Sequence, residues 1–258
     1  MSLCVSRRMT MAVLGGAAML CAACGTTEAP GPLSPSGAQG RIRFVNLITD
    51  TTRGRVNAIL ELLPFGVNLT YTQSTPASLP APATATYSPI LTGSRTLLLK
   101  RTVDTNTIVS TFSVTIAEGQ DRTVYAVGGT GGSAITSFIT TDDNALPAVG
   151  TQAKVRVVHL SPTAGAMDVF VTATGADLAA ATPTLTNIAN PSASAYLNLN
   201  AGTYQVRVVP AGTAAANRAA SVLITASVAL NGGTVRTIVA ADNNIGGAPL
   251  RAFVLSDR

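Results

Sequence analysis

The chain has 258 residues, of which 47% are hydrophobic and only 11% are charged, so it is long enough for one large or two ordinary domains with buried cores. Its formal net charge is +5; Arg7 and Arg8 lie together near the start, the other arginines are scattered singly, and the two lysines are Lys100 and Lys154. Proteins that bind nucleic acid usually gather basic residues on one face, so this pattern argues against a nucleic-acid partner.

Residues 1–24 have the features of a signal peptide. Arg7 and Arg8 provide a positive start, and residues 9–20 form a short apolar run rich in Ala, Met and Gly. The run is shorter than the roughly 20 apolar residues that span a bilayer. We therefore expect export of the chain rather than a membrane-spanning segment.

The end of this leader, Leu20-Cys21-Ala22-Ala23-Cys24-Gly25, resembles a bacterial lipobox, although Cys21 stands where that motif usually has leucine. The resemblance implies that Cys24 becomes the lipid-modified first residue and anchors the protein to a membrane. Gly25 is not the aspartate associated with inner-membrane retention, which implies the outer membrane in a Gram-negative host. The expected location is therefore the cell envelope, on the periplasmic or the surface face.

The positions of the cysteines fit an exported protein with a lipid anchor. The sequence has three, Cys4, Cys21 and Cys24, and all of them lie in the leader. The body is therefore predicted to have no disulfide, no thiolate metal site and no cysteine nucleophile. Residues 25–40 are rich in Pro, Gly and Ser, which predicts a flexible linker that holds the body away from the membrane.

The rest of the chain contains an internal repeat, with a first copy over 41–148 and a second over 152–258. Four blocks match in order, at a shift of between about 109 and 115 residues. They are 41–47 with 154–160, Tyr87 and Gly93 with Tyr196 and Gly202, 113–124 with 227–238, and 137–142 with 252–257.

Each copy has the pattern of short strands separated by turns. In the second copy, Val155 and Val157 alternate with polar residues, and runs at 203–208, 235–241 and 252–255 are rich in β-forming residues. Ser-Pro, Asn-Pro and Gly-containing turns separate these runs, and no long helical period is present. About seven strands per copy predict an all-β protein with two tandem immunoglobulin-like antiparallel β-sandwich domains.

The second copy resembles the family catalogued as domain of unknown function 4397. The resemblance rests on the segments 155–164 (VRVVHLSPTA), 167–171 (MDVFV) and 199–213 (LNAGTYQVRVVPAGT). The first copy departs from the pattern, with Asn46, Ile48 and Asn57 in place of His159, Ser161 and Asp168. The resemblance implies secreted or surface-anchored β-domains, often in tandem, and implies no established activity or catalytic residues.

His159, Ser161 and Asp168 are the residue types of a hydrolase triad. The equivalent positions of the first copy hold Asn46, Ile48 and Asn57, and no Gly-x-Ser-x-Gly turn accompanies the three residues, so we expect no catalytic role. His159 has the inward parity of Val155 and Val157, and a buried polar group there needs a partner. We therefore hypothesise two equivalent structural contacts, His159 with Asp168 and Asn46 with Asn57.

Other kinds of site are weakly supported by the sequence. The stretches 142–144 and 242–244 are rich in Asp and Asn and suit calcium, but turns explain them equally well. There is no Trp and few other aromatic residues, which disfavours a sugar-binding face, and a single His disfavours a transition-metal site. No cofactor is expected.

The sequence thus favours a non-catalytic envelope lipoprotein whose β-sandwiches bind a macromolecule or build structure through their loops. A sensor or accessory domain for a small envelope ligand, a sugar or a ligand bound with calcium, is the alternative. A hydrolase is third. A concave polar pocket near His159 would favour ligand binding or catalysis, whereas an open sheet edge would favour assembly.

Overall fold

The computed structural model describes residues 36–78 and 85–258, so the predicted signal peptide, Cys24 and most of the predicted linker lie outside the described residues. The last two residues of that linker, Gln39 and Gly40, already belong to the first strand. Within the described part, no helix is both long and apolar enough to cross a bilayer. The helical structure there consists of three short 3₁₀ turns: η1 (Thr130–Gly132), η2 (Ala215–Asn217) and η3 (Ala219–Ser221).

The first sandwich consists of two sheets. The inner sheet has the order β4 (Ser74–Thr75), β1 (Gln39–Ile48), β8 (Asp121–Gly128), β9 (Ile135–Asp142), and β5 (Ser88–Leu91) also pairs with β1. The outer sheet has the order β3 (Leu63–Leu69), β2 (Val56–Leu60), β6 (Gly93–Arg101), β7 (Ile108–Ile116).

The second sandwich repeats this arrangement strand for strand. Its inner sheet has the order β13 (Ser192–Ala193), β10 (Gln152–Leu160), β17 (Val235–Ala241), β18 (Arg251–Ser256), with β14 (Leu197–Asn200) also paired to β10. Its outer sheet has the order β12 (Leu185–Ile188), β11 (Met167–Thr172), β15 (Gly202–Pro210), β16 (Ile224–Leu230).

The predicted all-β fold with two tandem sandwiches is confirmed. The described residues of each sandwich form nine strands rather than about seven, because several are only two to four residues long. The sheets are mostly antiparallel, but each inner sheet contains one parallel pair, β1 with β8 and β10 with β17.

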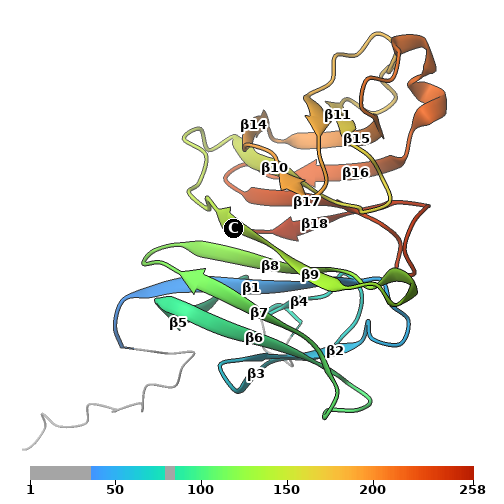
Figure 1. The fold of residues 1–258 in the computed structure, drawn as a ribbon. Coiled ribbons are helices and arrows are strands. Elements are labelled where there is room, and N and C mark those ends of the chain that lie inside the picture. Colours follow the sequence, from blue (N-terminus) through green and yellow to red (C-terminus); the bar gives the residue numbers. More distant parts are fainter. Residues whose placement is uncertain (1–35, 79–84) are drawn as a thin grey trace, which may run out of the picture.

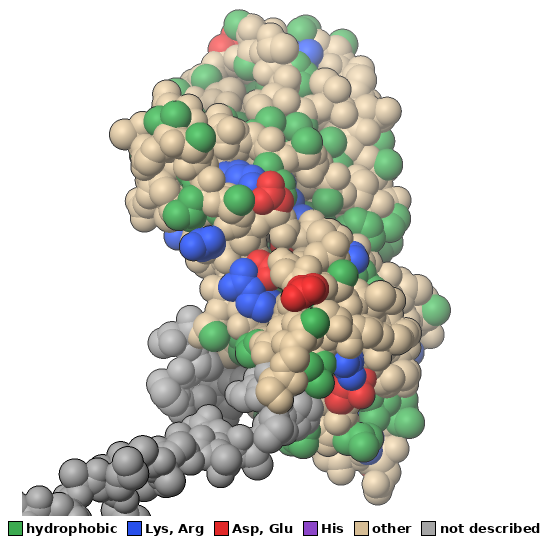
Figure 2. Space-filling view, turned by 90° about the vertical axis from the view of Figure 1, so that its left-hand side faces the viewer, with side chains coloured by type: hydrophobic (Ala, Val, Ile, Leu, Met, Phe, Trp, Pro, Cys, Tyr) green, Lys and Arg blue, Asp and Glu red, His purple; other side chains and the backbone are tan. Residues whose placement is uncertain are grey.

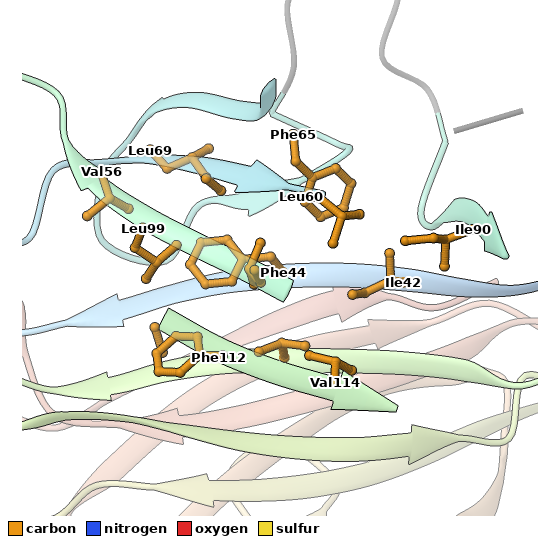
Figure 3. Packing of buried hydrophobic residues seen from close by; sticks show 14 of the residues in the cluster. Ile42, Phe44, Val56, Leu60, Phe65, Leu69, Ile90, Leu99, Phe112 and Val114 are labelled. Carbon is orange, nitrogen blue, oxygen red and sulfur yellow. The ribbon is translucent and has the colours of Figure 1, made fainter. Parts of the chain in front are cut away.

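The four sheets stack as layers, with the two inner sheets facing each other in the middle of the molecule (Figure 1). A core of aliphatic and aromatic side chains fills each sandwich; in the first, Phe44 of β1 and Phe112 of β7 lie among Leu and Val side chains (Figure 3). A third apolar cluster joins the two sandwiches. It contains Val45, Leu47, Tyr125, Val127, Val158, Leu160, Val239, Ala241 and Leu255.

This arrangement buries both faces of the first strand of each copy. Every side chain of β1 from Ile42 to Ile48 is buried, and every side chain of β10 from Ala153 to Leu160 is buried. Along β1, alternate residues such as Ile42 and Phe44 face the sandwich core, whereas Val45 and Leu47 face the other sandwich. Arg43 shares the parity of Val45, and it is therefore buried between the two sandwiches.

Candidate functional site

His159 lies at the end of β10 and is completely buried. Its Nε2 is 3.1 Å from the carbonyl oxygen of Gly165, and its Nδ1 is 3.3 Å from the backbone nitrogen of Ser161. The backbone N–H of Ser161 can only donate, so Nδ1 accepts and Nε2 carries the proton. Burial lowers the pKa of His159 below its ordinary value, which favours this neutral form.

Asn46 performs the same task at the end of β1. Its Oδ1 accepts the backbone N–H of Ile48 at 3.1 Å, and its Nδ2 donates to the carbonyl oxygens of Gly54 at 2.7 Å and Leu69 at 3.0 Å. In both copies the side chain therefore ties the end of an inner strand to the following loop.

Asp168 and Asn57 form a second equivalent pair of positions, on β11 and β2. Asp168 accepts the backbone N–H groups of Asn187 at 2.8 Å and Gly212 at 3.1 Å. Asn57 accepts from the backbone N–H of Asn68 at 2.8 Å and the hydroxyl of Thr102 at 3.3 Å.

The hypothesised contacts of His159 with Asp168 and of Asn46 with Asn57 are not among the hydrogen bonds of the described residues, and this corrects the sequence analysis. The two members of each pair belong to different sheets of a sandwich. Each instead meets backbone groups, some in loops, such as those of Gly165 and Gly212, and some in strands β3 and β12, and such groups need partners when they are buried.

Ser161 is completely buried, and its hydroxyl donates to Asp242 rather than to the imidazole of His159. Thr163 donates to the same carboxylate oxygen at 2.7 Å. A nucleophilic serine needs a base that accepts its hydroxyl proton and a substrate that can reach it. His159, Ser161 and Asp168 therefore do not form a catalytic triad.

The two Asp/Asn stretches considered for calcium have protein partners. Asn144 donates to Asp121 at 2.5 Å, Asp143 pairs with Lys154 at 2.5 Å, and Asn243 donates to the carbonyl of Ala248 at 2.7 Å. Among the described residues, no group of three or more His, Cys, Asp or Glu side chains is placed to hold a metal ion.

The most extensive polar cluster lies between the two sandwiches. Arg43, which is 2% exposed, reaches from β1 across the interface to Asp257 of the second sandwich at 2.7 Å. It also donates to Thr123 within its own sheet at 3.0 and 3.1 Å and to the carbonyl oxygen of Ser256 at 3.0 Å. Asp257 in turn accepts from Thr237 at 2.6 Å.

A reciprocal cluster completes the interface. Arg156, also 2% exposed, reaches from β10 to Asp142 of the first sandwich and donates to Thr237 at 2.9 Å. Tyr87 donates its hydroxyl to Asp142 at 2.7 Å, and Thr123 also donates to this carboxylate. Each sandwich thus supplies the arginine of one buried ion pair and the aspartate of the other.

Tyrosine rings cover the two arginines. The guanidinium carbon of Arg43 lies 4.5 Å from the ring centre of Tyr87, and that of Arg156 lies 5.0 Å from the ring centre of Tyr196. Burial would lower the pKa of both arginines, but neighbouring groups, among them the facing carboxylates, raise it above its ordinary value. Burial raises the pKa of Asp257, an effect that Arg43 opposes.

This interface was not predicted from the sequence, although the repeat contains a signal of it. Its polar residues are the same in both copies: Arg43 and Arg156, Thr123 and Thr237, Asp142 and Asp257, Tyr87 and Tyr196. A charged residue repeated in the middle of a β-strand indicates a buried partner, since such strands otherwise contain apolar residues on their buried faces.

Charged side chains also gather at the outside of this interface. They lie at the waist of the molecule, on the side where the chain ends in Figure 1 (Figure 2). Strands β1 and β8 both begin on this side, where Arg41 pairs with Asp121 at 2.5 Å. The side chain of Arg41 is 52% exposed, whereas that of Asp121 is 5% exposed, so only the arginine of this pair reaches the solvent.

Loops of both sandwiches border a hollow of about 430 Å³. Its lining includes Asp50, Arg55 and Tyr71 from the first sandwich, and Asn244 and Arg251 from the second. A second hollow, of about 600 Å³, lies beside Tyr196 and Arg156. The buried His159 lines neither of them, so neither hollow is the polar pocket at this residue that would favour ligand binding or catalysis.

The sequence profile of one family, described as Domain of unknown function (DUF4397), matches residues 40–170 and again residues 171–258. The two matches meet within β11, whereas the hydrogen-bonded sheets divide between β9 and β10. No curated protein matches the sequence.

Proposed function

The chain belongs to the DUF4397 family of domains of unknown function, and from this premise we propose that it is a non-catalytic module of the bacterial cell envelope. In this proposal the two sandwiches act as one rigid body that binds a macromolecule or builds envelope structure. A lipid on Cys24 anchors the module to the membrane, and the linker holds it away from the surface.

One observation carries the non-catalytic part of the proposal. His159, the chain's single histidine, is buried, and so are Ser161 and Asp168. Their hydrogen-bond partners are the carbonyl of Gly165, the carboxylate of Asp242 and the backbone N–H of Asn187, respectively. These residue types are the ones that a hydrolase would need in an accessible site. If the role of each residue is structural, other residues can take its place. The first copy has different residues at all three positions and keeps the same sheet order.

The non-catalytic role is tested by measuring turnover of chromogenic esters and amides by the full-length chain and by Ser161→Ala. We expect both proteins to remain at the background rate. A wild-type rate about tenfold or more above that of Ser161→Ala would contradict the proposal, since a general base or nucleophile typically contributes at least this much.

The anchor is tested separately, in the native host, by fatty-acid labelling and membrane fractionation of the wild type and Cys24→Ala. The variant is expected to lose both the label and the membrane association. Cys4→Ala, which changes another leader cysteine, is the control and is expected to keep both. A labelled, membrane-bound Cys24→Ala protein would overturn lipidation at this residue.

A further inference from the structure

We propose that the 430 Å³ hollow between the sandwiches binds an oxyanion, a carboxylate or phosphate group, through Arg55 and Arg251. This inference deepens the proposed binding role, because it names the chemistry of a ligand for the two-sandwich body.

The first observation is that both arginines have unused donors. Among the described arginines, only Arg55, Arg101 and Arg251 donate no side-chain hydrogen bond within the chain, and two of these three line the same hollow. A guanidinium carries five N–H donors in a planar fork that matches the oxygens of a carboxylate or phosphate.

The second observation is that the acidic residue of the lining does not neutralise the two arginines. Asp50 is the acidic residue in the lining, and its carboxylate is already paired with Arg53 at 2.5 Å. It also accepts hydrogen bonds from the backbone N–H groups of Thr52 at 2.7 Å and Arg53 at 3.0 Å. Burial would raise the pKa of Asp50, but these hydrogen bonds lower it, so Asp50 is ionised and satisfied by Arg53. The charges of Arg55 and Arg251 therefore remain available to a ligand.

The third observation is that these arginines are absent from the repeat. Strand pairing places Ala166 at the position of Arg55 and Thr136 at the position of Arg251. Arg43 and Arg156 of the buried interface occupy equivalent positions in the two copies, as is expected of residues that the fold requires. Arg55 and Arg251 instead occur once each, in different copies, and only the tandem arrangement brings them to one hollow.

The lining of the second hollow contains no arginine that is free of hydrogen bonds within the chain. Its arginine, Arg156, is committed to Asp142 and Thr237, and its Asp143 is paired with Lys154. In the first hollow, Asn244 and Tyr71 stand beside the two arginines. The Tyr71 hydroxyl donates to the carbonyl oxygen of Asp242 at 2.5 Å, which leaves its oxygen able to accept a hydrogen bond from a ligand.

The test is a calorimetric titration of the purified full-length chain with inorganic phosphate, glucuronate and glucose. We expect saturable binding of phosphate, glucuronate or both, with glucose inert. The preferred oxyanion then distinguishes a phosphate-bearing ligand from an acidic sugar. We expect Arg55→Gln and Arg251→Gln each to weaken this binding by about tenfold or more, as the loss of a charge-assisted hydrogen bond implies.

Arg258→Gln is the matched control, because it removes the same charge just beyond the opposite end of β18 from Arg251. It is expected to bind as the wild type does. No saturable oxyanion binding at millimolar concentration, equal binding by all the variants, or equal binding of glucose would overturn the proposal. This titration uses purified protein in solution, so its result is independent of the turnover and anchoring experiments.

Discussion

His159 and Asn46 show that one backbone task can be performed by two different side chains. Each accepts the N–H of the residue two positions later and donates to a carbonyl oxygen of the following loop. The histidine performs this task only while it is neutral, because a proton on Nδ1 would oppose the N–H of Ser161. The asparagine performs it at every pH.

We therefore predict that His159 makes the stability of the protein fall in mild acid. Burial lowers its pKa in the folded chain, so below its ordinary value of 6.5 the unfolded chain takes up a proton that the folded chain refuses. The free energy of unfolding should decrease as the pH falls from 7 towards 5, by at most about 1.4 kcal/mol per pH unit. Denaturant unfolding at a series of pH values measures this slope.

His159→Asn, which copies the residue of the first repeat, is expected to remove that part of the slope. The raised pKa of Asp257 makes stability change with pH in the opposite direction. Asp257 is present in both proteins, so the difference between their two slopes is the contribution of His159. Identical slopes in the wild type and the variant would show that His159 is not the titrating group. The chain contains no other histidine.

At these positions the sequence predicted burial but not the partners. The alternation of Val155, Val157 and His159 indicates an inward-facing row, and the structure buries all three. The carbonyl of Gly165 and the N–H of Gly212 come from loops, whose backbone course no periodic pattern reveals. The hypothesised side-chain pairing was wrong because backbone groups such as these are the hydrogen-bond partners.

At the scale of elements, the inner strands β1 and β10 are buried on both faces, and each contains one arginine that the other sandwich must satisfy. Breaking a buried ion pair leaves an uncompensated charge and typically costs about 3–5 kcal/mol. An exposed pair contributes about 0.2–1 kcal/mol. Strand β1 contains a fully buried pair, Arg43 with Asp257, and a half-exposed pair, Arg41 with Asp121.

We predict that Arg43→Ala and Asp257→Ala each destabilise the protein by about 3–5 kcal/mol, whereas the double variant loses clearly less than the sum. Arg41→Ala, two residues away on the same strand, is the control and should cost clearly less, because Arg41 is half-exposed and Asp121 keeps the hydrogen bond from Asn144. Chemical denaturation of the four variants measures these values. Additive losses for Arg43 and Asp257 would mean that the two residues do not interact.

The sequence predicted the elements and their repetition better than their association. Period-two alternation and turn residues identified strands and sandwiches, because both patterns are local. The face-to-face contact of β1 and β10 depends on residues more than a hundred positions apart, such as Arg43 and Asp257. The repeat contained the relevant positions, but an identity between copies does not by itself distinguish an internal core from an interface between the copies.

At the scale of the whole molecule, the two reciprocal ion pairs give the interface an approximate two-fold character. Arg43 meets Asp257 and Arg156 meets Asp142, as matching residues do in a symmetric dimer. Here the two partners are halves of one chain, so they meet without an intermolecular association step. The apolar cluster that includes Val45, Tyr125 and Val158 lies in the same interface. We expect the two sandwiches to behave as one rigid and cooperative unit.

The most direct test of this account is differential scanning calorimetry of the full-length chain beside the variant Arg43→Ala/Arg156→Ala, which removes both ion pairs. The wild type should unfold in a single transition whose van't Hoff enthalpy equals its calorimetric enthalpy, and the variant should unfold at a lower temperature, with the two sandwiches no longer melting together. Two separate transitions in the wild type, or an unchanged single transition in the variant, would contradict the conclusion that these buried pairs join the sandwiches into one body.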